Sequence, residues 1–206
     1  MKLVTVGDSF TYGEELAHRY DAWPQVLANK LGAIELINLG QPSASNDKIV
    51  RKTMDYFTVN SADLVVIGWS NIGRSEHADE YGYYDVWPGY QGNLFKQDGS
   101  SWRNDLVDYV SRYHNSDAIH KKFIQQIILL QSYFKVRGIR YIMLNIVQNE
   151  YYKKKLFDGH RQCFEQVDKE TFIGFNESGM MEFAIQANSV QRIKGEKVAM
   201  AAPTKH

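Results

Sequence analysis

Short apolar runs alternate with amphipathic segments along this chain, and this alternation restricts the fold more than any other feature. Strands are predicted at Leu3–Val6, Ile34–Leu39, Asp63–Gly68 and Arg140–Ile146, and the first of them is predicted to be buried. Helical spacing and capping residues predict helices over Asp21–Leu31, Ser45–Phe57, Asp117–Gly138 and Met180–Val190. Strands that alternate with helices predict an α/β protein whose parallel sheet is covered on both faces.

The length of 206 residues and the 44% of hydrophobic residues fit one domain, residues 1–206, with a sizeable core. The stretch from about residue 76 to 114 departs from the pattern, because it is rich in Tyr, Trp, Gly and Asp and has no clean period. We interpret it as an aromatic-rich insertion or long functional loop with short helical pieces. Its aromatic side chains would line a sugar- or acyl-binding surface, or pack a small subdomain.

Charge and cysteine content exclude several classes of protein. Lys plus Arg and Asp plus Glu both number 24, and a net charge of zero argues against broad binding to nucleic acid or anionic membranes. A single cysteine, Cys163, cannot form an internal disulfide, which suits a reducing compartment. With no signal-peptide pattern and no apolar run of about 18 residues, we expect a cytoplasmic protein without a membrane span. Zinc-binding and phosphate-loop motifs are missing, so neither metal nor cofactor is expected.

In an open parallel sheet the binding site lies outside the carboxyl ends of the strands. That rule predicts that residues 7–11, 40–46, 69–76 and 147–151 meet in space. Ser9, after the first strand, is either part of a simple turn or a nucleophile that needs a base and an oxyanion site. Polar candidates at the next two strand ends are Gly40, Ser43, Asn46, Ser70, Asn71, Arg74 and Glu76.

Some of these candidate residues also have a purely structural explanation. The run Ser45-Asn46-Asp47 is more typical of a helix cap than of catalysis. Arg74 and Glu76 would form a loop salt bridge or support the site. The sequence leaves this choice open.

The segment "GDSFTYGEEL" resembles the first block of the GDSL, or SGNH, hydrolases, and "VVIGWSNIGRSE" is similar to divergent, phage-type members. The resemblance implies a flavodoxin-like three-layer α/β/α sandwich with a parallel sheet. It also implies a serine hydrolase, an esterase, acylhydrolase or carbohydrate deacetylase, that acts on a small acyl ester or an acetylated sugar. In that family the serine at the position of Ser9 is the nucleophile, and its own N–H helps to bind the oxyanion.

The resemblance implies the other oxyanion donors as well. The family pattern Asn-x-x-x-x-Gly, counted from Asn38, places Ser43 where the family has a glycine that donates its N–H. The pattern Gly-x-Asn-Asp places Ser70 at the side-chain donor, with Asn71 one residue later, and either could serve. Asp8, Gly40, Arg74 and Glu76 are predicted to support the site.

The family's base is a histidine in an Asp-x-x-His block near the C-terminus. His206 has the right order in the chain, although Pro203 stands where the aspartate would be. His160 is the alternative, with Asp158 two residues before it, and His77 would qualify only if the insertion folds back. Because the family's closing helix is missing, we expect the C-terminal element to be truncated or degenerate.

Two other functions compete with hydrolysis. The weak third and last blocks favour an inactive SGNH scaffold that binds a protein or a glycan. A flavodoxin-like nucleotide binder is a remote third option, because fold alone does not determine function.

Overall fold

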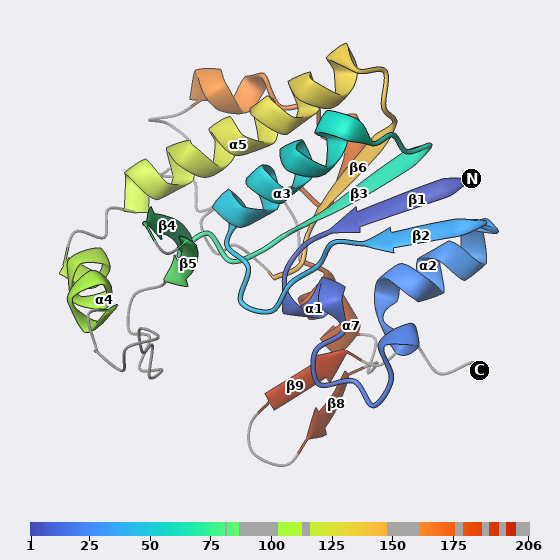
Figure 1. Ribbon diagram of the computed structural model, residues 1–206, viewed down its shortest axis with the longest axis horizontal. Helices are drawn as coiled ribbons and strands as arrows, with labels where there is room; N and C mark the ends of the chain where they lie inside the picture. Colours follow the sequence, from blue (N-terminus) through green and yellow to red (C-terminus); the bar gives the residue numbers. More distant parts are fainter. Residues whose placement is uncertain are drawn as a thin grey trace.

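The computed structural model describes residues 1–80, 82–86, 103–112, 116–147, 161–175, 179–186, 190–193 and 197–200 (Figure 1). Its central sheet contains β1 (Lys2–Val6), β2 (Glu35–Asn38), β3 (Leu64–Trp69), β6 (Tyr141–Asn145) and β7 (Phe172–Ile173). The helices are α1 (Ser9–Tyr12), α2 (Trp23–Leu31), α3 (Asn46–Val59), α4 (Arg103–Arg112), α5 (Ser116–Val136) and α7 (Met180–Gln186). Two hairpins pair β4 (Ser75–Asp79) with β5 (Gly82–Val86), and β8 (Val190–Ile193) with β9 (Lys197–Met200). Two 3-10 turns lie at Arg19–Asp21 and Lys169–Thr171.

The five strands of the central sheet are all parallel and follow the order β2-β1-β3-β6-β7. This is the 2-1-3-4-5 order of flavodoxin-like folds, and it confirms the predicted fold class. The strand order reverses between β1 and β3, so the loops that follow these two strands flank the switch point where such folds bind ligands.

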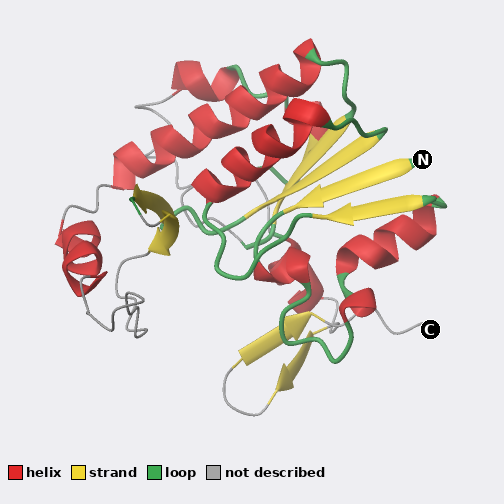
Figure 2. Cartoon of the chain, viewed as in Figure 1, coloured by secondary structure: helices red, strands yellow, loops and turns green. Residues whose placement is uncertain are grey.

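Helices cover both faces of the sheet, with α3 and α5 on one face and α2 on the other (Figures 1 and 2). The larger core cluster, on the α3 and α5 side, contains Phe57, Trp69 and Phe134. A smaller cluster joins Leu3 and Ala28 on the α2 side. All six residues of β3 are buried because both of its faces are covered, which explains its continuous apolar run.

The predicted helices and strands of the first 70 residues are confirmed, as are the long helix before Gly138 and the strand after it. Three elements differ from the prediction. The strand β7 is only two residues long and carries no detectable pattern. The described part of residues 76–114 contains α4, a short helix of the kind predicted there, and most of the β4–β5 hairpin, which was not predicted. The helix predicted at Met180–Val190 extends too far, because Val190 begins β8.

In the part of the chain that the structure describes, no helix is both long enough and apolar enough to cross a membrane.

Candidate active site

Ser9 is the first residue of α1 and follows β1 after a two-residue turn. The Asp8 carboxylate caps this short helix by accepting a hydrogen bond from the Phe10 N–H at 3.1 Å. Gly13 ends the helix in the left-handed conformation, with φ of 85°, and its N–H donates to the Ser9 carbonyl at 3.0 Å. The turn that presents the half-buried Ser9 is therefore capped at both ends.

Thr11 fits into a space that three glycines leave open. A Cβ at Gly7 would lie 2.0 Å from the Thr11 hydroxyl oxygen, closer than any real contact. A Cβ at Gly40 would lie 2.9 Å from the Cβ of Thr11, and one at Gly68 would lie 3.1 Å from its hydroxyl oxygen. Gly7 follows β1, Gly40 lies in the loop after β2, and Gly68 is the last residue but one of β3. Their small size therefore lets the strand ends close around α1.

Asn38, the last residue of β2, ties α1 to the loop after β2. Its amide nitrogen donates to the Thr11 carbonyl at 2.7 Å, and its amide oxygen accepts from the Gly40 N–H at 2.9 Å. Sequence reasoning used Asn38 only as the start of a spacing pattern. A side-chain amide at the carboxyl end of a strand of the parallel sheet was the signal that could have identified its role.

Ser43 lies in the left-handed region with φ of 61°, a conformation that glycine adopts more readily than serine. The helix α3 begins soon after it, with Ser45 as the N-cap, whose hydroxyl accepts from the Lys48 N–H at 3.2 Å. The cap predicted within Ser45-Asn46-Asp47 is thus made by Ser45. The Ser45 N–H donates to the Asp85 carboxylate at 2.8 Å, which ties this loop to strand β5.

Asn46 joins the loop after β2 to the loop after β3. Its amide oxygen accepts from the Ser70 N–H at 2.9 Å, and its amide nitrogen donates to the Ser70 carbonyl at 3.1 Å. Both residues are buried. The Asn46 side chain therefore satisfies the backbone of Ser70, 24 residues away, and does not cap the helix on which it lies.

A buried polar network connects Asp8, Ser70 and Arg74. The Ser70 hydroxyl donates to Asp8 Oδ2 at 2.8 Å. Arg74 Nη1 donates to the Ser70 hydroxyl oxygen at 3.1 Å and lies 3.7 Å from Asp8 Oδ2. Burial raises the pKa of Asp8 above its usual range, while the hydrogen bond from Ser70 and the charge of Arg74 oppose that rise.

Asn71 lies outside this network. It is exposed, and its amide oxygen accepts from the Gly73 N–H at 2.8 Å. The Arg74 N–H donates to the Asn71 carbonyl at 3.2 Å. These two bonds close a tight turn that returns Arg74 toward Ser70.

Glu76 belongs to an ion-pair network that fixes the β4–β5 hairpin on α3. Arg51 holds the Glu76 carboxylate with two hydrogen bonds, of 2.8 and 2.7 Å. Asp85 on β5 pairs with Lys48, and Asp47 accepts from the Glu76 N–H at 3.0 Å. Of the two roles predicted for Glu76, the structure shows the salt bridge. The aromatic composition of this stretch gave no signal for the hairpin.

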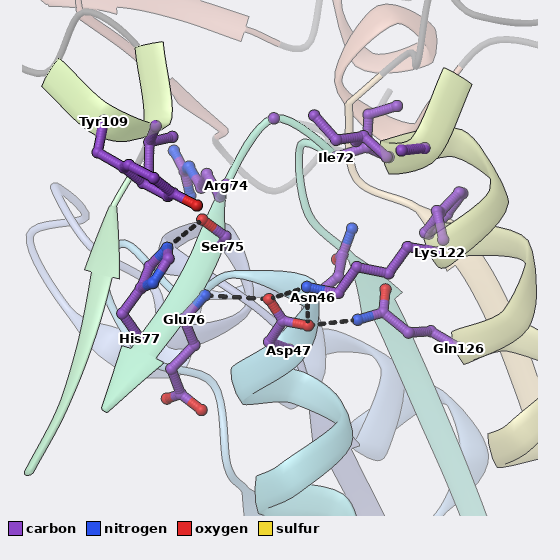
Figure 3. A pocket seen from close by; sticks show the side chains of 15 residues that line it. Asn46, Asp47, Ile72, Arg74, Ser75, Glu76, His77, Tyr109, Lys122 and Gln126 are labelled. Carbon is purple, nitrogen blue, oxygen red and sulfur yellow. Dashed lines mark hydrogen bonds and ion pairs between the residues drawn. The ribbon is translucent and has the colours of Figure 1, made fainter. Parts of the chain in front are cut away.

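The two histidines proposed as base, His206 and His160, lie outside the described residues. His77 lies on β4, within the β4–β5 hairpin, and its Nε2 lies 3.1 Å from the Ser75 hydroxyl (Figure 3). Burial lowers the pKa of His77 and the Lys122 charge adds to this, while the Asp47 charge opposes it.

A cavity of about 250 Å³ lies between the loop after β3, strand β4, α4 and the first half of α5 (Figure 3). Its wall is apolar at Ile72 and Phe123 and polar at Ser75, His77 and Gln126. Arg74 and Asn46 also line it, so the cavity adjoins the network that holds Asp8. Within the described ranges, no group of three or more His, Cys, Asp or Glu side chains is arranged to hold a metal ion.

This fold has counterparts among solved structures. The psychrotrophic esterase EstA from Pseudoalteromonas sp., in a structure inhibited by monoethylphosphonate, is 13% identical and has a TM-score of 0.51, over 93% of this chain and 84% of that one. A lipolytic G-D-S-L family member from Veillonella parvula DSM 2008 is 12% identical, with a TM-score of 0.40, over 91% and 74%. LAE5, an alpha/beta hydrolase enzyme from the metagenome of Lake Arreo, Spain, is 13% identical, with a TM-score of 0.47, over 98% and 87%.

The parallel sheet and its strand order give the chain a flavodoxin-like α/β architecture, and the Gly-Asp-Ser turn follows its first strand. The likeness to the esterase EstA confirms the predicted resemblance at the level of the fold. No curated protein matches the chain in sequence. A family model described as "Family of unknown function (DUF6071)" matches residues 9–205, and the chain belongs to that family.

Proposed function

We propose that this protein is a serine-dependent ester hydrolase with Ser9 as its nucleophile. One observation carries the proposal: the loops after β1, β2 and β3 are bonded to one another around the turn that presents Ser9. Such a set of fixed strand ends is what a nucleophile and an oxyanion site require. The esterase-like fold adds to this support.

In the proposed reaction, the Ser9 hydroxyl oxygen attacks the acyl carbonyl carbon while a base takes the hydroxyl proton. The N–H groups of Ser9 and Ser43 stabilise the resulting oxyanion. Collapse of the tetrahedral intermediate expels the alcohol, which leaves with the proton held by the base. Water then attacks the acyl-serine ester and gives a proton to the base, and the base returns this proton to the Ser9 oxygen as the carboxylic acid leaves. His206 is the proposed base, with His160 as the alternative.

The backbone of Ser43 supports its part in this mechanism. The resemblance places Ser43 where the family has glycine, and Ser43 adopts a left-handed conformation that glycine favours. The left-handed backbone of Ser43 therefore supports its assignment to the glycine position of the family, although the residue type differs.

The cavity beside Arg74 supports a small, neutral substrate. Its volume of about 250 Å³ is below the ~300–1,000 Å³ of sites for drug-sized ligands. The charged groups of its lining have partners inside the protein: Lys122 with Asp47 at 2.7 Å, and Glu76 with Arg51 at 2.7 Å. A short acyl ester or an acetylated sugar suits a lining of apolar groups, neutral polar groups and charged groups that are ion-paired within the protein.

The test combines hydrolysis of p-nitrophenyl acetate with labelling by a fluorophosphonate probe. The Ser9→Ala variant should lose both, because the attacking oxygen is removed. Thr58→Ala is the control, since it deletes an exposed hydroxyl on α3 that bonds only within its own helix. Its hydrolysis and labelling should equal those of the wild type.

Two outcomes would refute the assignment. Labelling that persists in Ser9→Ala and disappears in Ser75→Ala would transfer the nucleophile to the serine beside His77. A folded wild type with neither hydrolysis nor labelling would favour the alternative function, a scaffold that binds a protein or a glycan without turnover.

A further inference from the structure

Ser70, the first residue of the loop after β3, already uses its one hydroxyl hydrogen on Asp8. Ser70 is fully buried, and its hydroxyl hydrogen is directed to Asp8 Oδ2 at 2.8 Å. A hydroxyl has only one hydrogen to donate, so Ser70 cannot at the same time donate it to an oxyanion on Ser9. Asn71 is exposed on the turn that follows.

Arg74 brings a cation to this position. The turn closed by the hydrogen bonds of Asn71 returns Arg74 over Ser70, and Arg74 Nη1 lies 3.1 Å from the Ser70 hydroxyl oxygen. The same nitrogen is 3.7 Å from Asp8 Oδ2, and Asp8 directly precedes Ser9. A guanidinium group has five N–H donors in a rigid fork, so these contacts through Nη1 also fix the direction of the others.

Side-chain length makes Ser70 and Arg74 complementary. An asparagine at position 70 would extend two heavy atoms beyond Cβ along one branch, whereas serine extends only one. Arg74 Nη1 lies 3.1 Å from the hydroxyl oxygen at the end of this shorter side chain.

We propose that Arg74 is a catalytic residue that donates a charged hydrogen bond to the oxyanion formed on Ser9. A cationic donor stabilises developing negative charge more strongly than a neutral amide does, and more so where water is partly excluded. Arg74 meets this condition, because only 25% of its side chain is exposed. This assignment rests on the proposed function.

The experiment measures kcat and KM for p-nitrophenyl acetate in Arg74→Ala, Arg74→Gln and the double variant Ser70→Asn/Arg74→Ala. Loss of one oxyanion donor typically lowers kcat by about 10²–10³-fold, and we expect this loss in both single variants with little change in KM. Arg74→Gln keeps most of the bulk, so it carries the test if Arg74→Ala does not fold. The double variant should recover much of the lost kcat, because the side-chain amide introduced at position 70 then reaches the vacated position.

Arg51→Ala is the matched control, because Arg51 is 26% exposed and is also ion-paired. It should lower the thermal midpoint while kcat stays close to the wild-type value. The pH at which kcat reaches half its maximum should not move in Arg74→Gln, since a guanidinium remains charged throughout the accessible range.

Three results would overturn the assignment of Arg74. These are an unchanged kcat in Arg74→Gln, an equal fall in kcat in Arg51→Ala, or no recovery in the folded double variant. The failure of the proposed function differs from all three, because hydrolysis would then be missing in the wild type or unaffected in Ser9→Ala. Both proposals would fall together in that case.

Discussion

The loops around Ser9 and the β4–β5 hairpin are attached to the rest of the molecule in different ways. Short side chains that are almost completely buried, such as Asn46 and Ser70, join the loops to one another. Long charged side chains join the hairpin to α3, and one member of each pair, Arg51 or Lys48, reaches solvent. A buried hydrogen bond is costly to leave unmade, whereas an ion pair that water can reach contributes less. The site loops are therefore held more firmly than the hairpin beside them.

The largest effect is expected from Asn46→Ala. This change leaves the buried N–H and C=O of Ser70 without partners, and it should lower the free energy of unfolding by about 2–3 kcal/mol. Urea denaturation measures the change. The control is Asn60→Ala, which removes an amide at the other end of α3 whose bond to Tyr56 is only partly buried. An equal loss in both variants would remove the contrast between the two regions.

A smaller loss is expected from Arg51→Ala. The Glu76 side chain is 5% exposed and would lose its bidentate partner, at a cost of about 1–2 kcal/mol, between the values for surface and buried pairs. A double-mutant cycle with Glu76→Gln measures the interaction energy of the Arg51–Glu76 pair separately from the packing that is lost with the arginine side chain. A coupling energy as large as the loss in Asn46→Ala would show that the hairpin is held as firmly as the loops.

The backbone of Ser43 predicts a small change in the opposite direction. Ser43→Gly should raise the free energy of unfolding by about 0.5 kcal/mol, because glycine tolerates φ of 61° better, and its greater freedom in the unfolded chain offsets part of the gain. Gly32→Ala is the reverse substitution and serves as the control, since Gly32 has φ of 62° and a Cβ added to it would meet no neighbouring atom within 4 Å. It should lower stability by about 1 kcal/mol. Stabilisation by both substitutions would contradict the backbone explanation.

The stability contributions of Asp8 and Asp168 are expected to change in opposite directions as pH rises. Because burial raises the pKa of Asp8, its contribution to stability is complete below the ordinary aspartate value of about 3.9 and is lost as pH rises through the higher folded value. Lys135 at 2.7 Å lowers the pKa of Asp168, so the contribution of Asp168 is present above about 3.9 and is lost as pH falls.

Urea denaturation from about pH 3 to 6 tests these signs through the difference between the wild type and each variant. The difference for Asp8→Asn should decrease with rising pH, and that for Asp168→Asn should increase. Parallel trends in the two variants would show that one of the assignments is wrong.

Local patterns were enough to predict the frame of the molecule. The apolar run at Leu64–Trp69 and the spacing along Ser116–Val136 identify a buried strand and a long helix, because each depends on residues close in sequence. The same patterns placed the loops after β1, β2 and β3 at one edge of the sheet. They could not predict the partner of a polar side chain when that partner lies far along the chain.

Asn46 and Glu76 illustrate this limit. The run Ser45-Asn46-Asp47 satisfies the sequence rule for a helix cap, yet Asn46 bonds to Ser70 across the switch point. Glu76 pairs with Arg51, 25 residues earlier, on an element whose composition shows no period. Both contacts form only when the sheet brings distant segments together, so local sequence propensity cannot predict them.

The space around Thr11 has a consequence for how the position of Ser9 is encoded. Three glycines surround Thr11, and a methyl group at Gly7 or Gly40 would collide with α1. Thr11, two residues after Ser9, therefore packs closely against the sheet only because the glycines around it have no Cβ atom. In a library that varies every position of this edge, Ser9 would tolerate small replacements without loss of fold. The two glycines would tolerate none, although neither takes part in the chemistry.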